Sequence, residues 1–384
     1  MIFDSESVFE DNVITVLKQH GWKDGVLRYP TERDLLDNWK GILYRNNNDI
    51  DRLGKYPLTD GEMAQIIEQI ETLRTPLALN SFVNGRTVSI TRDNKEDVAH
   101  FGKEISLYIY DRKEIAGGKS TYQIAQQPVY PAKNKMLNSR RGDLVLLING
   151  MPLIHIELKK SGIPVSQATN QIEKYTHEGV FTGLFRLVQI FVAMNPDDAV
   201  YFANPGVDKF NPSYYFHWAD YNNEPICGGQ NPGKDEWKLF IGGTSGTAGL
   251  LSIPMAHQLI GFYTIADSAD GCLKVLRSYQ YIAANAISDV VRKCDWEQRP
   301  TTPGRPGGYV WHTTGSGKTM TSFKSAQLIA DSHDADKVVF LMDRIELGTQ
   351  SLKEYRSFAD SETEVQGTEN TGVLRDKLNS TNVN

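Results

Sequence analysis

Two features that lie far apart in the chain restrict its fold more than any other part of the sequence. The first is a strand hairpin, because the apolar segments 144–148 and 153–158 flank Asn149-Gly150, a dipeptide typical of a tight two-residue turn. The second is a glycine-rich loop over residues 312–319, which follows a short apolar segment and precedes a helical one. Together they predict an α/β chain, and 384 residues are enough for two or three domains.

Local periodicity orders the rest of the chain. Residues 6–19 have apolar side chains at helical spacing, and alternating apolar and polar residues indicate strands further on. We expect these elements in order: helical stretches to about residue 78, strands over 87–91 and 105–110, a helix over 166–177, and a strand over 188–193. The segment 222–235 is rich in Gly, Pro and Asn, so we place one domain at residues 1–235 and a second at 236–384.

Composition favours a soluble, cytoplasmic protein. The N-terminus has no basic segment followed by an apolar run, and no stretch reaches the roughly 20 apolar residues that span a bilayer. Cys227, Cys272 and Cys294 lie far apart without the spacing of metal ligands, which is typical of reduced thiols. The net charge of −6 does not indicate a DNA-binding protein, but acidic and basic surfaces can be segregated within one chain.

The hairpin carries residues suited to metal-dependent hydrolysis of phosphodiesters. Side chains alternate between the faces of a strand, so Glu157 and Lys159 share a face, and the tight turn places Asp143 nearly opposite Glu157. Two carboxylates this close repel each other unless a hard cation such as Mg²⁺ lies between them. Lys159 would orient the attacking water or stabilise the developing negative charge. The alternative is a solvated strand face with an ordinary salt bridge between Glu157 and Lys159.

Neighbouring residues strengthen the first interpretation. Gln171 and Tyr175 lie at positions i and i+4 of the next helix, hence on one face, where both can form hydrogen bonds at the site. A basic run precedes the first carboxylate and is suited to holding DNA phosphates, although a solvated loop is the alternative for the run taken alone. The run consists of Lys133, Lys135, Arg140 and Arg141.

The glycine-rich loop is suited to binding ATP or GTP. Gly315 and Gly317 permit backbone conformations that direct several N–H groups at one anion, and the following helix adds its N-terminal dipole. Lys318 would reach the terminal phosphates, and the Thr319 hydroxyl would bind the Mg²⁺ of the nucleotide. The strict pattern has Gly where this chain has His312. We expect a βαβ unit formed by strands over 309–311 and 337–342 and a helix over 318–330.

The hairpin and the helix after it resemble a known family. Gly142-Asp143, Glu157-Leu158-Lys159 and the spacing of Gln171 and Tyr175 resemble the PD-(D/E)xK nuclease pattern with its Gln-x-x-x-Tyr extension. Gly142 stands where the usual pattern has Pro. This combination is similar to the N-terminal domain of restriction (R) subunits of type I restriction–modification enzymes.

That resemblance implies roles for individual residues. The catalytic residues that it implies are Asp143, Glu157, Lys159, Gln171 and Tyr175. It also implies Mg²⁺ as the cofactor of the nuclease site, held by Asp143 and Glu157. Glu10 lies on the first predicted helix, where many such nucleases contribute an extra acid, so it is a further metal-ligand candidate. The alternative for Glu10 is an exposed helix glutamate.

The second domain resembles superfamily 2 helicase-like translocases. Residues 311–319 resemble motif I, Asp343-Arg344 followed by Leu347 resembles motif Ia, and residues 277–280 resemble the adenine-reading Q motif. Gln280 would then hydrogen-bond the adenine edge, and the alternative is an ordinary amide on a helix surface. The residues implied for ATP are Arg277, Gln280, Thr314, Gly315, Ser316, Gly317, Lys318 and Thr319, the last through Mg²⁺.

The resemblance as a whole implies a fold and a function. The fold is α/β: a PD-(D/E)xK nuclease-like mixed sheet flanked by helices, followed by a partial RecA-like parallel α/β motor domain. The function is that of the DNA endonuclease and ATP-dependent translocase subunit of a type I restriction enzyme, which cuts double-stranded DNA away from its recognition site. The implied partners are the modification (M) and specificity (S) subunits, with no membrane.

Other functions remain open at this point. They are a nuclease-helicase of DNA repair or of type III restriction, a non-catalytic ATP-binding assembly module, and a plain ATPase with an unrelated N-terminal domain. The sequence after Lys318 has no Asp-Glu box on a third strand, so the chain resembles roughly the first third of a full R subunit. We therefore expect it to bind ATP without hydrolysing it at a useful rate.

Overall fold

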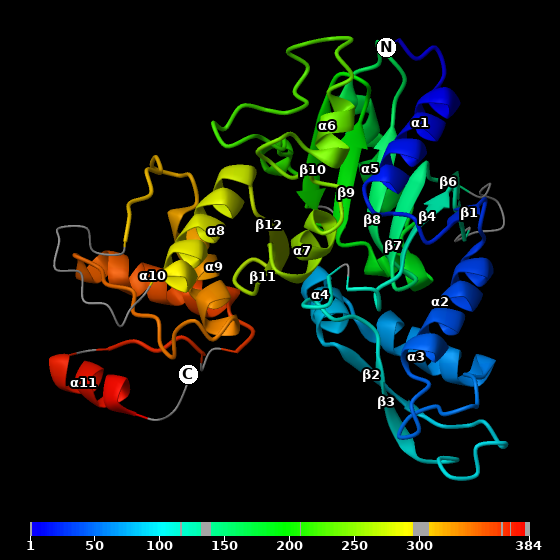
Figure 1. Ribbon diagram of the computed structural model, residues 1–384, viewed down its shortest axis with the longest axis horizontal. Coiled ribbons are helices and arrows are strands. Elements are labelled where there is room, and N and C mark those ends of the chain that lie inside the picture. Colours follow the sequence, from blue (N-terminus) through cyan, green and yellow to red (C-terminus); the bar gives the residue numbers. More distant parts are fainter. Residues whose placement is uncertain are drawn as a thin grey trace. The chain divides into compact units, whose positions relative to one another are not determined.

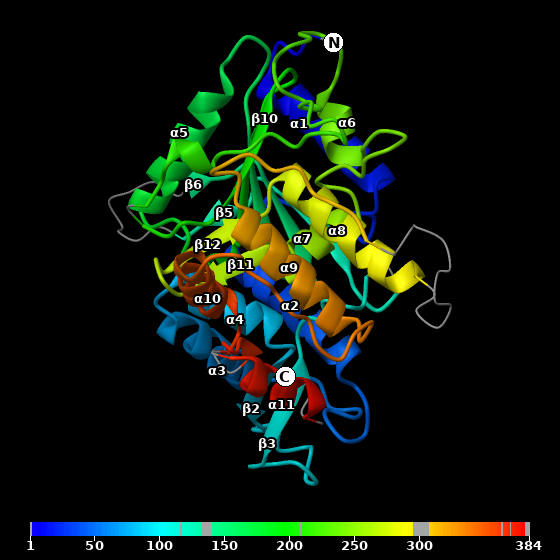
Figure 2. The same ribbon diagram turned by 90° about the vertical axis from the view of Figure 1, so that its left-hand side faces the viewer.

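The chain forms two compact units, which Figures 1 and 2 show in two views. The computed structural model describes residues 2–115, 117–131, 140–207, 209–294, 307–361, 364–368 and 370–380. Unit 1 comprises Met1–Thr264 and Cys272–Val275, and unit 2 comprises Ile265–Gly271 and Leu276–Asn384. The residues expected at a nuclease site all lie in unit 1, and those expected to bind ATP all lie in unit 2.

A six-stranded mixed sheet is the centre of unit 1. The strand order is β1-β4-β7-β8-β9-β10, in which β1 is parallel to β4, β8 is parallel to β9, and the other neighbours are antiparallel. Every residue of β4, β7, β8, β9 and β10 is buried, as in strands that are covered on both faces. The strands are Val26–Arg28 (β1), Tyr122–Gln126 (β4), Leu144–Ile148 (β7), Met151–Leu158 (β8), Ile190–Met194 (β9) and Ala199–Ala203 (β10).

Helices cover this sheet, and Figure 2 shows α5 on one side of it and α1 with α6 on the other. The helices of unit 1 are α1 (Glu6–Gln19), α2 (Glu32–Asn46), α3 (Asp60–Thr72), α4 (Pro76–Asn84), α5 (Val165–His177), α6 (Trp237–Gly242) and α7 (Met255–Gly261), with 3-10 turns η1 (Gly183–Leu187) and η2 (Pro212–Tyr214). Two small antiparallel sheets pair β2 (Thr87–Thr91) with β3 (Glu104–Tyr108) and β5 (Val129–Tyr130) with β6 (Arg140–Arg141). The predicted helix over residues 6–19 is confirmed as α1.

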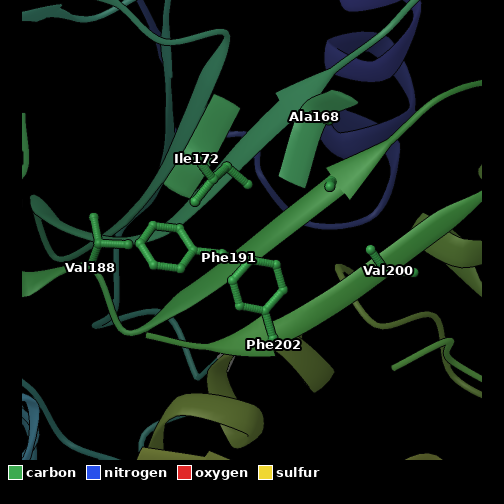
Figure 3. Close-up of a cluster of buried hydrophobic side chains, with 7 residues drawn as sticks. Ala168, Ile172, Val188, Phe191, Val200 and Phe202 are labelled. Atoms are coloured by element: carbon green, nitrogen blue, oxygen red, sulfur yellow. The ribbon is translucent and has the colours of Figure 1, made fainter. Parts of the chain in front are cut away.

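A cluster of apolar side chains fixes α5 to the sheet (Figure 3). Ala168 and Ile172 of α5 belong to one buried cluster with Phe191 of β9 and Phe202 of β10, whose ring centroids are 5.5 Å apart. Each large apolar side chain contributes about 1.5–3 kcal/mol when it is fully buried. Because β9 is the parallel neighbour of β8, this packing also fixes α5 beside β8.

Strands β7 and β8 form the hairpin expected from Asn149-Gly150. The two turn residues have φ angles of 53° and 84°, and a two-residue type I′ turn requires positive φ at both positions. A Cβ on Gly150 would lie 2.9 Å from Trp39, so the close approach of α2 also requires glycine. The register pairs Leu144 with Ile156, which puts residue 143 opposite residue 157 at the open end of the hairpin.

Unit 1 extends further along the chain than the sequence predicted. Trp237 of α6 packs edge-on against Phe9 of α1 with ring centroids 5.2 Å apart, and the Trp22 indole N–H donates to Leu251 O at 2.6 Å. Residues 236–264 therefore belong to unit 1, although the composition of residues 222–235 had predicted a second domain at 236–384. The Gly-, Pro- and Asn-rich segment is a surface loop within unit 1, because aromatic contacts between distant residues leave no mark in local composition.

Unit 2 contains the helix expected after the glycine-rich loop. Phe323 of this helix, α9, packs against Tyr355 and Phe358 of α10, with ring centroids 5.6 Å apart in both pairs. The helices among its described residues are α8 (Ser278–Lys293), α9 (Lys318–Asp331), α10 (Ile345–Phe358) and α11 (Thr371–Asn379). The chain leaves unit 1 at the start of β11 (Thr264–Asp267), returns to it over β12 (Cys272–Val275), and continues in unit 2 from Leu276.

The strands expected over 309–311 and 337–342 are not formed in the part of the chain that the structure describes. Their apolar side chains are exposed: Tyr309 is 90% exposed, Trp311 88% and Leu341 88%. A strand is stable only when its backbone groups pair with a neighbour, and the described residues of unit 2 offer these two segments none. The expected βαβ unit is therefore wrong in its strands and right in its helix.

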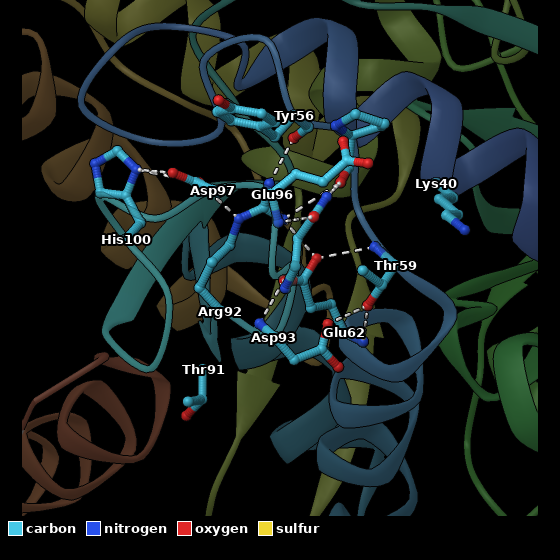
Figure 4. A network of polar contacts seen from close by, with 12 residues as sticks. Lys40, Tyr56, Thr59, Glu62, Thr91, Arg92, Asp93, Glu96, Asp97 and His100 are labelled. Atoms are coloured by element: carbon cyan, nitrogen blue, oxygen red, sulfur yellow. Dashed lines mark hydrogen bonds and ion pairs between the residues drawn. The ribbon is translucent and has the colours of Figure 1, made fainter.

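A buried arginine ties α3 to the chain after β2 (Figure 4). The Arg92 guanidinium donates to Glu62 Oε2 at 2.7 Å and to Asp97 Oδ2 at 3.0 Å, and it also donates to the carbonyls of Tyr56 and Pro57. The side chains of Arg92 and Glu62 are 0% exposed, so both charges depend on this network for the partners that water would otherwise supply.

We predict that Arg92→Ala destabilises unit 1 strongly, because it leaves two buried carboxylates without their cation. The free energy of unfolding should fall by about 3–5 kcal/mol in urea denaturation. Arg33→Ala is the matched control, since Arg33 pairs with Asp37 and Asp60 on the surface and its loss should change stability little. Equal effects of the two substitutions would contradict the assigned role of Arg92.

Candidate functional site

The open end of the β7–β8 hairpin brings two acidic side chains together. Asp143 directly precedes β7 and accepts a hydrogen bond from the backbone N–H of Leu158 at 2.7 Å, so it reaches across to β8. Glu157 is the second-last residue of β8 and is 0% exposed. The expected juxtaposition of the two carboxyl groups is therefore present, and the solvated strand face considered as its alternative is absent.

Burial makes this acidic pair resist ionisation. It raises the pKa of Asp143 to about 8, and the negative charge of Glu157 raises it further. It also raises the pKa of Glu157 to about 7, although Lys159 and a hydrogen bond with Asp143 act in the opposite direction. In the absence of a cation, the two carboxyl groups therefore retain protons near neutral pH.

Lys159 places a buried ammonium group beside the pair. Its Nζ lies 3.4 Å from Glu157 Oε1, donates to Leu158 O at 2.7 Å, and lies 3.7 Å from Glu6 Oε1. Lys159 is 7% exposed, so its charge acts in surroundings that screen it poorly. The Lys159 ammonium, held this close to Glu157, can donate a hydrogen bond to a water molecule or a phosphate oxygen bound at the same place.

The expected partners on α5 form a chain of hydrogen bonds that ends near Asp143. Gln171 Nε2 donates to the Tyr175 hydroxyl at 2.7 Å, and this hydroxyl donates to Arg141 O at 2.9 Å. Burial raises the pKa of Tyr175, so it remains a protonated donor. This series of hydrogen bonds fixes the backbone at Arg141, two residues before Asp143. Beside it lies a pocket of 340 Å³ lined by Arg140, Gln167, Asn170, Gln171, Lys174 and Tyr175.

Glu10 is buried rather than exposed, but amides hold it. Its Oε1 accepts from Gln126 Nε2 at 2.6 Å and its Oε2 accepts from Gln127 Nε2 at 3.2 Å. Burial raises its pKa, and the charge of Asp143 adds to this effect, so the two side chains are within electrostatic reach. Within the described ranges, no group of three or more His, Cys, Asp and Glu side chains has an arrangement that could hold a metal ion.

The pair of Asp143 and Glu157 nevertheless fits a divalent cation. Glu157 Oε2 is buried and has no hydrogen-bond partner, which is an unfavourable state for a carboxylate oxygen. Oxygen donors from two carboxylates are the ligands that Mg²⁺ prefers, with water completing its coordination. Asp143 and Glu157 are therefore the residues that fit the cation, and Glu10 stays a prediction as a third.

Two aromatic residues at this site were not expected from the sequence. His155 is 0% exposed and lies two residues before Glu157 on the same face of β8, with its Nε2 at 3.3 Å from Glu157 Oε2. The Tyr130 hydroxyl lies 2.9 Å from His155 Nδ1. Burial lowers the pKa of His155 to about 4, so the ring is neutral at pH 7. Strand alternation alone would have placed His155 beside Glu157, but nothing in the sequence pointed to Tyr130.

The basic run before Asp143 is only partly described. Lys133 and Lys135 lie outside the described residues. Arg140 forms two hydrogen bonds of 2.9 Å with Glu178, and the Arg141 guanidinium lies 5.9 Å from the centroid of the Tyr29 ring. Glu178 already compensates the charge of Arg140, so contact of this run with DNA phosphates stays a prediction.

The glycine-rich loop of unit 2 has the expected backbone. Gly315 and Gly317 have φ angles of 78° and 80°, in the left-handed region that favours glycine, and α9 begins at Lys318 directly after them. Thr314, Gly315, Gly317 and Lys318 are exposed, and Lys318 Nζ donates to Thr313 O at 3.0 Å. The loop and its lysine are thus open to a nucleotide, while Ser316 and Thr319 are half-buried.

The residues of the expected Q motif form hydrogen bonds with the backbone of this loop. Gln280 Nε2 donates to Gly317 O at 3.2 Å, and its Oε1 accepts from the Arg277 backbone N–H at 2.9 Å. The Tyr279 hydroxyl donates to Ser316 O at 2.8 Å. Gln280 is 3% exposed, so it is not the surface amide considered as the alternative. Its contact with adenine stays a prediction and would require these bonds to open.

Comparison with known families defines the class of protein. Residues 4–210 match the family described as type I restriction enzyme R protein N terminus, and residues 279–384 match the SWI2/SNF2 ATPase family. The first match covers more than half of the chain. The chain therefore belongs to the type I restriction enzyme R protein family, as the resemblance implied.

Individual relatives agree with this assignment. A type I restriction enzyme endonuclease subunit of Staphylococcus aureus strain COL is 32% identical over 99% of this chain, and one of Staphylococcus saprophyticus is 31% identical over 98%. The EcoprrI endonuclease subunit of Escherichia coli is 29% identical over 55% of this chain and 62% of its own length. The chain spans 36% of the length of the two staphylococcal relatives.

Among the helices that the structure describes, none has both the length and the apolar character that a membrane span needs.

The acidic pair predicts that stability depends on pH when no divalent cation is present. The folded pKa values of Asp143 and Glu157 lie above the usual 3.8 and 4.5, so between about pH 4 and 8 the folded chain binds more protons than the unfolded one. The free energy of unfolding should fall as the pH rises through this window and the loss should be complete above it.

Glu157→Gln tests this expectation, because it removes one acid and the repulsion on the other. With a chelator present, the free energy of unfolding of this variant should depend less steeply on pH than that of the original chain. The two slopes should differ by up to about 1.4 kcal/mol per pH unit. Urea denaturation of both proteins between about pH 5 and 8 measures the difference. Parallel pH profiles would show that the pair does not titrate in this range.

Proposed function

We propose that this chain contains the DNA-cleaving site and part of the ATP-driven motor of a type I restriction enzyme endonuclease subunit. Unit 1 hydrolyses DNA phosphodiesters at Asp143, Glu157 and Lys159. Unit 2 binds ATP with Mg²⁺ at residues 313–319. Both segments match families in the same chain, and relatives that align with nearly all of it carry the name endonuclease subunit, which supports joining the two chemistries.

The observation that carries the proposal is the buried pair of carboxyl groups on one hairpin. A structural strand would place apolar residues at such positions, since burying an ionisable group costs free energy unless it is paired or neutralised. Here two acids share a buried place with one ammonium group, and Glu157 Oε2 is left without a partner. Perturbed acids of this kind gather at functional sites.

Asp143 and Glu157 are the residues that would hold Mg²⁺. When bound, the cation supplies polarisation of the scissile phosphate and a water molecule of lowered pKa. Lys159 holds its ammonium where it can donate to that water or to a phosphate oxygen as negative charge develops. Gln171 and Tyr175 hold the backbone that leads into Asp143.

The polar face of α5 supports a path for DNA beside the site. Gln167, Asn170, Gln171 and Lys174 recur at helical spacing and line the pocket next to Tyr175. Amides and a lysine are typical donors to phosphate oxygens, which position a duplex without reading its sequence. Double-stranded DNA is the proposed substrate, and sequence recognition would belong to a specificity subunit.

In the complete subunit, we propose that unit 2 belongs to an ATP-dependent translocase that moves DNA past the complex. The subunit would assemble with modification and specificity subunits, and cleavage would fall away from the recognition site. The exposed glycine-rich loop and the match of residues 279–384 to an ATPase family support the nucleotide-binding part of this proposal.

We predict that the chain binds Mn²⁺ at the hairpin, and calorimetric titration measures this directly. Glu157→Ala should abolish the binding, because it removes half of the protein ligands. Glu173→Ala is the matched control, since Glu173 is a half-buried glutamate of α5 that pairs with His177 away from the hairpin. Binding that is absent from the original chain, or equal in all three proteins, would favour the non-catalytic assembly module.

Lys159→Ala separates metal binding from catalysis. It should leave Mn²⁺ binding in place but reduce DNA cleavage by the complete, ATP-supplied enzyme by at least about 100-fold, because it removes a donor to the developing charge. Cleavage at the original rate would contradict the role given to Lys159 and would favour a plain ATPase with an unrelated N-terminal domain.

We predict that the chain binds ATP through Lys318. Lys318→Ala should weaken the binding of a fluorescent ATP analogue at least about 10-fold, since a charged hydrogen bond to phosphate contributes about 1.5–3 kcal/mol. Lys353→Ala, an exposed lysine of α10, should bind the analogue as the original chain does. Equal affinity in the two variants would show that the loop does not hold the phosphates.

A further inference from the structure

His155 and Glu157 bring two unsatisfied polar atoms face to face inside unit 1. His155 Nε2 and Glu157 Oε2 are both buried, lie 3.3 Å apart, and have no hydrogen-bond partner in the structure as it stands. A buried polar atom without a partner is costly, so each of these atoms requires the other or a shared third group.

The other ring nitrogen of His155 decides which of these two cases applies. Nδ1 lies 2.9 Å from the Tyr130 hydroxyl, and a neutral imidazole carries one N–H. If Tyr130 donates its hydroxyl proton to Nδ1, the imidazole proton is on Nε2, the nitrogen that lies 3.3 Å from Glu157 Oε2. In the opposite tautomer, the Nε2 lone pair would face a carboxylate oxygen. When the Glu157 carboxylate is ionised, as it is when it holds a metal, hydrogen-bond accounting therefore favours a proton on Nε2.

We propose that Tyr130 and His155 are positioning residues that hold the Glu157 carboxylate for its metal. The Tyr130 hydroxyl donates to His155 Nδ1, and His155 Nε2–H donates to Glu157 Oε2, while Lys159 lies beside Oε1. Each carboxylate oxygen keeps a lone pair for a cation. This inference rests on the proposed function, in which Glu157 is a metal ligand.

Gly142 is the residue that makes room for this pair. A Cβ on Gly142 would lie 2.5 Å from the Tyr130 hydroxyl oxygen and 2.8 Å from His155 Cε1, closer than real contacts allow. The usual Pro of the nuclease pattern would place a ring there. The departure at position 142 is thus explained by the pair: a chain with Tyr130 and His155 in these places requires glycine before Asp143.

A second tyrosine–histidine pair in unit 1 has the same chemistry without the carboxylate. The Tyr122 hydroxyl lies 2.9 Å from His257 Nδ1, and His257 Nε2 lies 3.0 Å from the backbone oxygen of Asp111. Both tyrosines are almost fully buried. Tyr122→Phe is therefore a matched control for Tyr130→Phe, because it deletes the same hydroxyl from the same kind of pair away from Glu157.

The first test is calorimetric Mn²⁺ titration of the chain and of four variants: Tyr130→Phe, His155→Leu, Tyr122→Phe and Glu157→Ala. We expect Tyr130→Phe and His155→Leu to weaken Mn²⁺ binding by about 10–100-fold, as loss of partners behind metal ligands typically does. Tyr122→Phe should bind as the original chain does, and Glu157→Ala should not bind. Unchanged affinity in Tyr130→Phe, beside loss in Glu157→Ala, would overturn this inference and leave the proposed function in place.

The second test needs no metal and is made at a pH above the raised pKa of Glu157, about 7, so that this carboxylate is ionised. In chain labelled with ¹⁵N-histidine, the ring-nitrogen shifts of His155, assigned with His155→Gln, should show a neutral ring protonated at Nε2. Tyr130→Phe should move these shifts toward the other tautomer, and Tyr122→Phe should not. A ring protonated at Nδ1 in the original chain would overturn the inference. Failure of the original chain to bind Mn²⁺, with the expected tautomer present, would contradict the proposed function instead.

Discussion

Two carboxyl groups that have lost most of their hydration are the constraint on which the rest of unit 1 depends. Asp143 and Glu157 meet across β7 and β8, and burial raises the pKa of each toward or above neutrality. Such a pair is unfavourable for folding, so the surrounding structure must hold it in place. A fully buried hairpin, a covering helix and a buried ammonium group at Lys159 provide that support. The burial of the apolar residues of β7 and β8 stabilises the hairpin and offsets the free energy that burying the two carboxyl groups costs.

The support comes from elements that are distant in sequence. The parallel pairing of β8 with β9, together with the apolar cluster around Phe191, fixes α5 and thereby Gln171 and Tyr175. From the N-terminal end of the chain, α1 contributes Glu6 near Lys159 and Glu10 near Asp143. Sites built on strands and helices hold their side chains more rigidly than sites on loops, which suits a reaction that tolerates little misplacement of its groups.

Sequence reasoning succeeded where the physics is local. The Asn149-Gly150 turn requires positive φ at two positions, and the sequence alone indicates this turn and the hairpin. The turn by itself would pair residue 143 with residue 156, however, and a register shift between Leu146 and Leu147, which the pattern does not predict, brings Asp143 opposite Glu157. Sequence reasoning failed where distant contacts decide. Trp237 joins α1 through aromatic packing, so the boundary at residue 235 was wrong. The apolar segments near Trp311 and Leu341 read as strands, but a strand needs a neighbour that the sequence pattern cannot guarantee.

The glycine-rich loop of unit 2 and the acidic pair of unit 1 differ in how far their hydrogen bonds are already arranged for a ligand. The loop before Lys318 has the backbone that a phosphate needs, yet its lysine donates to Thr313 O and Gln280 is held by the loop itself. A nucleotide must exchange these bonds for its own, so part of its binding energy is used in rearrangement. The acidic pair of unit 1 is already assembled, and a cation would relieve its repulsion without moving the backbone. We therefore expect the hairpin to bind its cation as a preformed site, whereas the glycine-rich loop changes its hydrogen bonds when ATP arrives.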